Sequence, residues 1–115
     1  MARHVVCSAD DLPVGSMKAF KAGETRVVVY HLKNGFYATQ GQCTHTFGPL
    51  ARGEIVKGCQ VQCPLHHARF DIATGAVMRW ANFPPGIQLL NAVRGEKALR
   101  TFKVEVRNGN VEVMA

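Results

Sequence analysis

Two short stretches of the sequence carry residue types that bind metals in proteins. Cys43 and His45 lie in the first stretch, and Cys63 and His66 lie in the second, with seventeen residues between His45 and Cys63. Each stretch supplies one thiolate and one imidazole, which are ligands for zinc and for iron. The sequence therefore predicts that two loops converge on one metal centre.

The mixture of cysteine and histidine within each stretch bears on the identity of the metal. Zinc fingers place two cysteines on one knuckle and two histidines on a helix, so a mixed pair in each loop departs from that arrangement. In a Rieske centre, two cysteines bind one iron of a [2Fe-2S] cluster and two histidines bind the other, so each loop can give one ligand to each iron. The mixed pairs favour the iron-sulfur centre, and a zinc-binding interaction domain stays open as an alternative.

The residues that follow His66 extend the pattern. They read His-Ala-Arg-Phe-Asp over 67–71 and Thr-Gly at 74–75. With the two metal-binding pairs they resemble the signature of Rieske-type ferredoxins, in which C-x-H is followed by C-P-x-H-x-x-x-F and then by T-G. The resemblance covers nearly the whole chain, including 35–38 and 102–106. It implies one Rieske [2Fe-2S] cluster per chain, bound by Cys43, His45, Cys63 and His66.

Rieske-type ferredoxins are the small electron carriers of bacterial multicomponent oxygenases. The resemblance implies that this chain accepts single electrons from an NAD(P)H-dependent flavin reductase. It would pass them to a terminal oxygenase or dioxygenase of aromatic hydrocarbon catabolism and dock only transiently on each partner. The chain itself would not be an enzyme, so we expect no catalytic residue in it.

One departure from the family pattern keeps a second function open. His67 stands where glycine is common in the ferredoxins, and the run His-His-Ala at 66–68 resembles Rieske modules of larger oxidoreductases. One such module is the small subunit of an assimilatory nitrite reductase. We expect His67 to be exposed and not to bind the cluster, because Cys63 and His66 already satisfy the spacing.

The length of the chain fits a small protein that works with partners. Its 115 residues are expected to form one Rieske domain, 1–115, which leaves no room for an oxygenase or flavin domain as well. We find neither an apolar run long enough to span a membrane nor a basic-then-apolar leader. The sequence therefore predicts a cytoplasmic monomer that does not bind membranes.

The formal charge of +6 departs from the acidic character common in ferredoxins of this type. Basic residues are densest between Arg94 and Arg107. This stretch is either a solvated strand face or a docking surface for an acidic partner, and both alternatives stay open. We expect no binding to nucleic acid, because neither a helix nor interleaved aromatic residues accompany the charge.

Two further cysteines, Cys7 and Cys59, are expected to be reduced thiols. Cys59, Val61 and Cys63 alternate with two glutamines, so the pattern predicts that Cys59 points into the core on the same strand face as Cys63. We expect Cys7 to be a small buried hydrophobic residue as well.

Short β-branched runs and frequent turn residues, without an amphipathic helix, predict an all-β sandwich. The family resemblance implies that it is a Rieske-type antiparallel β-sandwich with cluster-binding loops at about 41–50 and 61–72, together at one tip. Residues 83–86 resemble the proline loop that covers the cluster in this family. Trp80 suits either the core or the rim of the cluster, and 87–100 gives no firm pattern. Strands are expected over 2–7, 25–32, 36–40, 54–57, 59–63, 69–72, 76–80, 101–107 and 110–114.

The residues around the two ligand pairs predict a low reduction potential. High-potential Rieske proteins have an extra cysteine in each loop, forming a disulfide, and a serine and a tyrosine whose hydroxyls donate toward the cluster. The matching positions here are Gly48, Leu65, Ala68 and Phe70, which offer neither a thiol nor a hydroxyl. We expect a midpoint near the low end of the Rieske range, at about −150 mV. A redox titration with a strongly positive midpoint would contradict this prediction.

Overall fold

The computed structural model describes residues 3–42, 50–64, 68–79 and 98–115, and the architecture below refers to these ranges. They contain no helix long and apolar enough to cross a lipid bilayer. Two short 3-10 turns are present, η1 (Ala9–Asp11) and η2 (Leu50–Arg52). The strands are β1 (Arg3–Ser8), β2 (Ser16–Ala22), β3 (Thr25–Leu32), β4 (Gly35–Gln40), β5 (Glu54–Val56), β6 (Gln60–Gln62), β7 (Arg69–Asp71), β8 (Val77–Arg79), β9 (Thr101–Arg107) and β10 (Asn110–Met114).

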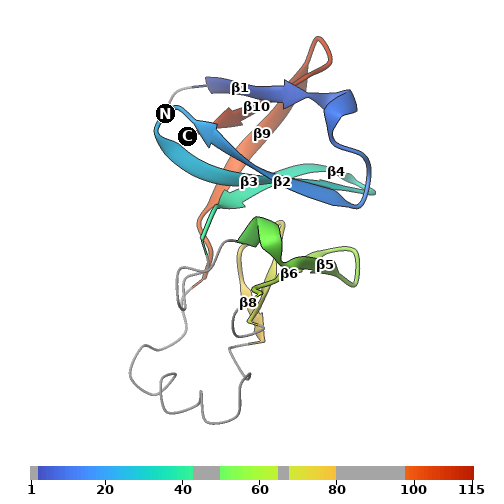
Figure 1. Cartoon of the computed structure of the whole chain (residues 1–115), viewed down its shortest axis with the longest axis vertical. Helices are drawn as coiled ribbons and strands as arrows, with labels where there is room; N and C mark the ends of the chain where they lie inside the picture. Colours follow the sequence, from blue (N-terminus) through green and yellow to red (C-terminus); the bar gives the residue numbers. More distant parts are fainter. Residues whose placement is uncertain (1–2, 43–49, 65–67, 80–97) are drawn as a thin grey trace.

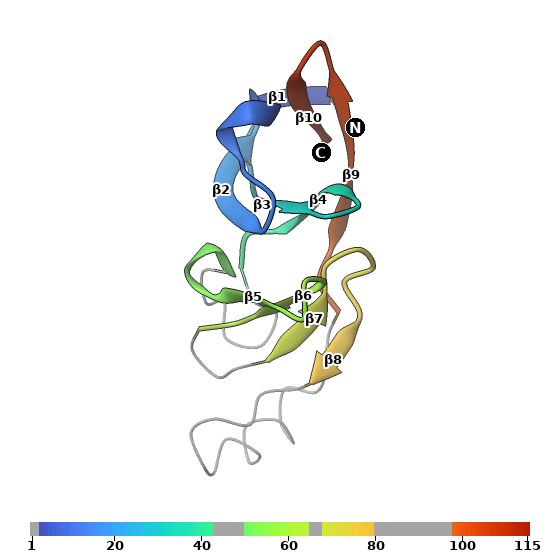
Figure 2. The same ribbon diagram turned by 90° about the vertical axis from the view of Figure 1, so that its right-hand side faces the viewer.

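The strands form two antiparallel sheets, which confirms the predicted all-β class (Figure 1). The larger sheet has six strands in the order β1-β10-β9-β4-β3-β2, and the smaller has four in the order β5-β6-β7-β8. The six-stranded sheet curls until its two edge strands, β1 and β2, come into contact, so that it encloses a core of its own (Figure 2). The four-stranded sheet lies beyond β3 and β4 at one end of the molecule.

Local sequence signals account for most of the hairpins. Asn108 and Gly109 both have positive φ, of 52° and 77°, and join β9 to β10 through the two-residue turn that the Asn-Gly pair predicts. After β1, Ser8 caps η1, because its hydroxyl accepts from the amide of Asp10 while Asp11 accepts from the amide of Ser8. The capping pair stabilises this single turn, which Pro13 and Gly15 follow closely.

Strand β2 was not expected from the sequence. Its residues, Ser-Met-Lys-Ala-Phe-Lys-Ala, alternate poorly in hydrophobicity and include weak strand formers. It pairs with β3 along its whole length, from Ser16 opposite His31 to Ala22 opposite Thr25. Pairing with a strongly β-forming neighbour therefore outweighs the weak local propensity.

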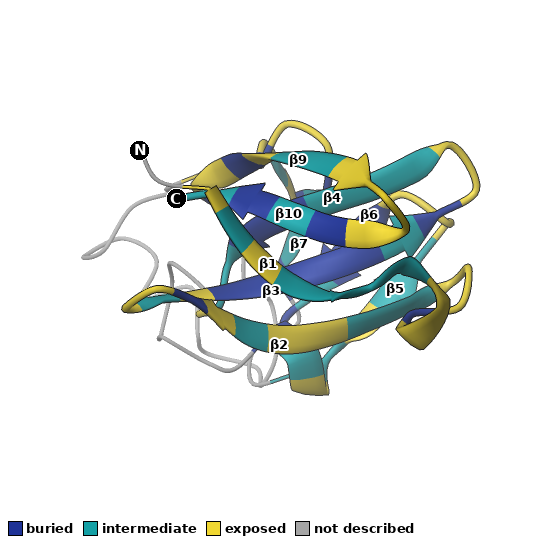
Figure 3. Cartoon of the chain, turned by 90° about the horizontal axis from the view of Figure 1, so that it is seen from above, coloured by how far each residue is buried: buried dark blue, intermediate teal, exposed yellow. Residues whose placement is uncertain are grey.

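Strand β3 is buried on both faces (Figure 3). Val27 and Val29 point into the curled sheet, where they join the barrel core of Leu12, Ala22, Ala38, Phe102, Val111 and Val113. The alternate residues of β3 point toward the four-stranded sheet and belong to a second cluster, which we call the loop core. The loop core consists of Val28, Tyr30, Leu32, Leu50, Val61, Cys63, Ala68, Phe70, Ile72 and Leu99.

The turn between β7 and β8 holds the backbone at Leu99, where the chain returns to β9. Asp71 accepts hydrogen bonds from the amide and hydroxyl of Thr74, at 3.0 and 2.7 Å. Gly75 has a φ of 78°, and its carbonyl accepts from the amide of Leu99 at 2.8 Å. A Cβ at Gly75 would overlap the carbonyl oxygen of Leu99. Glycine is thus required here both for backbone conformation and for close approach.

These contacts predict a large loss of stability for Gly75→Ala. Gly109→Ala is the matched control, because Gly109 has nearly the same φ, 77°, and open space around its Cα. Chemical denaturation should show that Gly109→Ala lowers the free energy of unfolding by about 1–2 kcal/mol, from backbone strain alone. Gly75→Ala should lose about 1–3 kcal/mol more, because the new methyl group displaces Leu99. Equal losses for the two variants would refute the close-approach argument.

Candidate metal centre

Of the four predicted ligands, the structure describes Cys63. Its side chain is fully buried in the loop core, directly after β6. Cys43, His45 and His66 lie outside the described residues, as do His67, Trp80 and the proline loop at 83–86. The described residues therefore define the bases of the two predicted ligand loops.

The second loop has a closed base. The amide of Cys63 donates to the carbonyl of Ala68 at 2.8 Å, directly beyond the ladder that pairs Gln62 with Arg69. The Arg69 guanidinium also donates from Nε to the side-chain oxygen of Gln62 at 2.8 Å. Pro64 follows Cys63 and restricts the backbone where the loop leaves the strand. The hairpin thus holds Cys63 and Ala68 at a fixed separation.

The first loop is closed in the same way. The amide of Leu50 donates to the carbonyl of Gly41 at 3.1 Å, and the amide of Gly41 donates to Arg26 on β3 at 3.0 Å. A Cβ at Gly41 would lie 3.3 Å from the Cβ and the carbonyl oxygen of Arg26, so the loop leaves β4 tightly against β3. Both ends of the first loop are therefore attached to the six-stranded sheet.

The two loop bases stand on one core. Leu50, Cys63 and Ala68 are all fully buried and belong to the loop core. The backbone of Gly53 also lies against the carbonyl of Gln62, where any larger residue would overlap. The chain leaving the first loop thus packs directly on the strand that enters the second. This arrangement brings the bases of the two predicted ligand loops to the same end of the molecule.

Among the residues that the structure describes, Cys63 packs in an apolar cluster. Tyr30 lies in the same core, and its hydroxyl pairs with the Thr39 hydroxyl at 2.7 Å. Burial raises the pKa of Tyr30 well above its ordinary value, so the phenol stays neutral. Ala68 and Phe70, both fully buried, contribute no hydroxyl beside Cys63. A buried thiol in apolar surroundings fits a ligand of a soft metal centre such as an iron-sulfur cluster.

Gln40 is a positioning residue that the sequence analysis missed. Its amide nitrogen donates to the carbonyl of Gln42 at 2.7 Å, at the entrance to the first loop. Its amide oxygen accepts from the backbone amide of Arg100 at 2.8 Å, and its own backbone amide donates to the Arg100 carbonyl. One side chain thus joins the first loop to the segment that returns from 80–97. Residues sixty positions apart carry no sequence signal of such a contact.

The prediction for Cys59 was wrong. Cys59 is exposed and lies in the turn before β6 rather than on the strand. Lys57 and Gly58 have positive φ, of 55° and 69°, and the amide of Cys59 closes this turn on Val56. The strand alternation therefore begins only at Gln60, after Cys59. Cys7 is half-buried against the barrel core, and burial raises the pKa of its thiol.

Histidines in the strands have structural contacts. His31 stacks on Phe36 with ring centroids 3.9 Å apart, and its Nδ1 lies 2.6 Å from the carbonyl of Leu12. The ring of His4 lies against Gly23. These contacts account for both side chains without a metal.

Comparisons with known proteins point to one family. Residues 2–103 match the family described as the Rieske [2Fe-2S] domain. The chain is 36% identical over 98% of its length to the ferredoxin component of biphenyl 2,3-dioxygenase from Rhodococcus jostii, and covers 92% of that protein. It is 33% identical to the ferredoxin component of the naphthalene 1,2-dioxygenase/salicylate 5-hydroxylase systems of Ralstonia sp. That match spans 60% of this chain and 65% of the relative.

A solved structure agrees with these relatives. It is the complex of reduced oxygenase and oxidized ferredoxin in carbazole 1,9a-dioxygenase. The matched chain superimposes with a TM-score of 0.76 and 30% sequence identity, over 96% of this chain and 91% of its own length.

The contacts of Gln40 predict that its amide stabilises the loop bases. Gln40→Leu removes two side-chain hydrogen bonds and should lower the free energy of unfolding by about 2 kcal/mol, measured by chemical denaturation. It should also lower the iron retained after gel filtration, since the base of the first loop loses its side-chain hydrogen bonds to Gln42 and Arg100. Gln42→Leu makes the same chemical change at an exposed position and should alter neither quantity. If the Gln40 variant matched the Gln42 variant, the positioning role would be refuted.

Proposed function

The chain belongs to the Rieske [2Fe-2S] domain family, and we propose that it carries single electrons from an NAD(P)H-dependent flavin reductase to a terminal oxygenase. The observation that carries this proposal is the pair of closed loop bases on one buried core, each leading into a Cys/His pair. The ferredoxin relatives of the biphenyl and naphthalene systems support the electron-carrier role. The oxygenase partner is supported by the complex of a similar ferredoxin with its oxygenase.

We assign the cluster ligands by residue type and position. Cys43 and Cys63 would bind one iron, and His45 and His66 would bind the other, so each loop holds both irons. When bound, the cluster supplies a one-electron couple. Burial of Cys63 keeps water from its thiolate, and the hydrogen bond from its amide to Ala68 holds the second loop in register. His67 is proposed to be exposed and without a metal bond.

The chain is proposed to act as a cytoplasmic monomer of one domain, 1–115, that catalyses no bond change itself. A carrier has to leave each partner after transfer, so its interfaces are expected to be small, below about 1,200 Å² in total. The histidine rings, which we propose lie at the surface, would give the electron a short path to either partner. Tight co-purification with a large subunit at fixed stoichiometry would instead favour a subunit of a larger oxidoreductase.

Reconstituted turnover tests the carrier function and the ligand assignment together. A flavin reductase, this protein and an aromatic-ring oxygenase should support NAD(P)H-driven hydroxylation only when all three are present. His67→Ala should retain turnover and the Rieske signal in electron paramagnetic resonance after reduction. His66→Ala should lose both, because one iron loses an imidazole. The opposite outcome for the two histidines would reverse the ligand assignment, and a colourless zinc protein would refute the proposal.

A further inference from the structure

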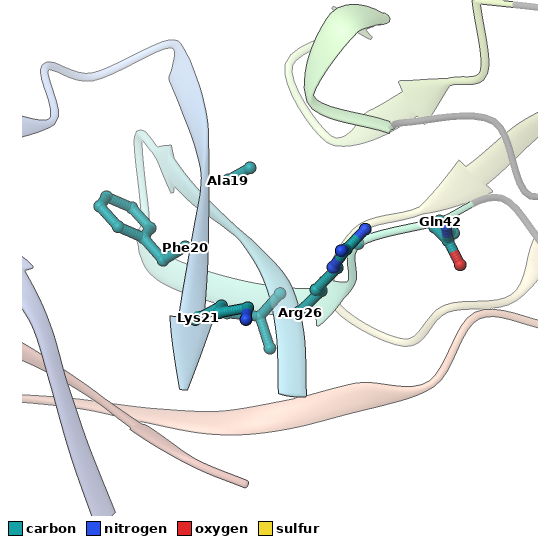
Figure 4. A pocket seen from close by; sticks show the side chains of 7 residues that line it. Ala19, Phe20, Lys21, Arg26 and Gln42 are labelled. Atoms are coloured by element: carbon teal, nitrogen blue, oxygen red, sulfur yellow. The ribbon is translucent and has the colours of Figure 1, made fainter. Parts of the chain in front are cut away.

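A groove of about 470 Å³ opens beside the first ligand loop and has no part in the function proposed above. Gly41 and Gln42 form one end of it, and Gln42 directly precedes the proposed ligand Cys43. Figure 4 shows Arg26 extending from β3 toward Gln42. The groove therefore belongs to the same surface as the loop. Its lining residues are Ala19, Phe20, Lys21, Arg26, Val27, Gly41 and Gln42.

Two cations stand directly opposite each other in this groove. Lys21 on β2 pairs in register with Arg26 on β3, and both side chains are exposed. Side chains at such positions have Cβ atoms about 4.5–5.5 Å apart, where like charges destabilise the sheet. Within the part of the chain that the structure describes, neither forms an ion pair with a carboxylate. The fold thus carries an uncompensated pair of positive charges here.

The basic residues between Arg94 and Arg107 differ from Lys21 and Arg26, because those that the structure describes contact other side chains. Lys103 lies 3.6 Å from Glu105, and Arg107 lies 4.0 Å from Glu112. Arg100 lies over the ring of Phe102, 4.9 Å from its centroid. The described cations of 98–107 therefore already have partners on the surface of the six-stranded sheet. Lys21 and Arg26 are better placed to receive an anionic group from another molecule.

We infer that this groove binds an acidic segment of the terminal oxygenase. A carboxylate would sit between Lys21 and Arg26, and a neighbouring apolar side chain would pack on Ala19, which lies on the same face of β2 as Lys21. The inference rests on the proposed function, because it takes the oxygenase to dock over the cluster loops. Salt-dependent steering to this pair would also give the net charge of +6 a local role.

The groove lies close enough to the base of the first loop to be covered by an interface of the size expected for a transient complex. An interface that buries about 600 Å² on each partner extends about 14 Å from its centre. Gly41 lies two residues from Cys43, which is at most about 7 Å along the chain. A partner centred on Gly41, at the base of the first loop, would therefore cover Arg26 and Lys21. The mixed apolar and cationic lining fits a peptide segment better than a small free anion, which would leave Ala19 uncovered.

Charge reversal tests the inference with a matched control. The double variant Lys21→Glu/Arg26→Glu should bind the oxygenase that accepts electrons from the wild-type protein at least tenfold more weakly, measured by biolayer interferometry in 50 mM salt. In 300 mM salt the difference should shrink to less than about threefold. The control Lys33→Glu/Lys57→Glu removes the same positive charge, but Lys33 lies seven residues from Arg26 along β3, about 23 Å away. It should change the affinity less than threefold.

A single substitution separates binding from folding. Lys21→Glu places opposite charges across the β2–β3 ladder and should raise the thermal midpoint by about 1–4 °C. It should nevertheless weaken binding to the oxygenase. A purely structural role for Lys21 predicts that stability and affinity change in the same direction, which would overturn the inference.

The remaining outcomes distinguish this inference from the proposed function. If the wild-type protein binds and reduces no oxygenase, both fail. If it does so and the groove variant binds equally well, or the control variant loses as much affinity, the groove alone is refuted. In a nuclear magnetic resonance titration, an acetylated Glu-Glu-Phe-Glu peptide should shift the amides of Lys21 and Arg26. Tighter binding of inorganic phosphate than of the peptide, or a defect confined to reduction by the flavin reductase, would refute the oxygenase segment as the occupant.

Discussion

The burial of β3 on both faces is the constraint on which the rest of the structure depends. Val27 and Val29 fill the curled six-stranded sheet, while Val28 and Tyr30 face the four-stranded sheet and the loop core. Each fully buried aliphatic side chain of this kind contributes about 1.5–3 kcal/mol to folding. One strand therefore couples the stability of the barrel core to the position of both ligand loops.

The bases of the two predicted ligand loops are positioned by β3 and by the loop core that packs on it. The first loop leaves β4 at Gly41, whose amide is bonded to Arg26 of β3, and it closes at Leu50. The second closes between Cys63 and Ala68 above the same buried cluster. Preformed bases of this kind reduce the ordering that a bound cluster has to impose on its ligands, because the flanking backbone is already fixed.

The sequence predicted the parts of the fold that local chemistry controls. The Asn-Gly turn at 108–109 and the β-branched run of β3 are found at the predicted positions. Strand β2 was missed because only its pairing with β3 makes it a strand, and Cys59 was misplaced because a tight turn delays the start of β6. For the site, the spacing of Cys and His predicts a ligand set of which the structure describes Cys63. The bridging role of Gln40 depends on a contact with Arg100 that no local pattern encodes.

The central claim is that two thiolates and two imidazoles, one of each from either loop, hold two irons in unlike surroundings. The Mössbauer spectrum of the oxidised, ⁵⁷Fe-enriched protein tests it most directly, because each iron reports its own ligands. The account predicts two doublets of equal area, one from an iron bound only by sulfur and one from an iron bound by two nitrogens. A single doublet from equivalent irons, or a protein that holds one zinc ion and no iron, would contradict it.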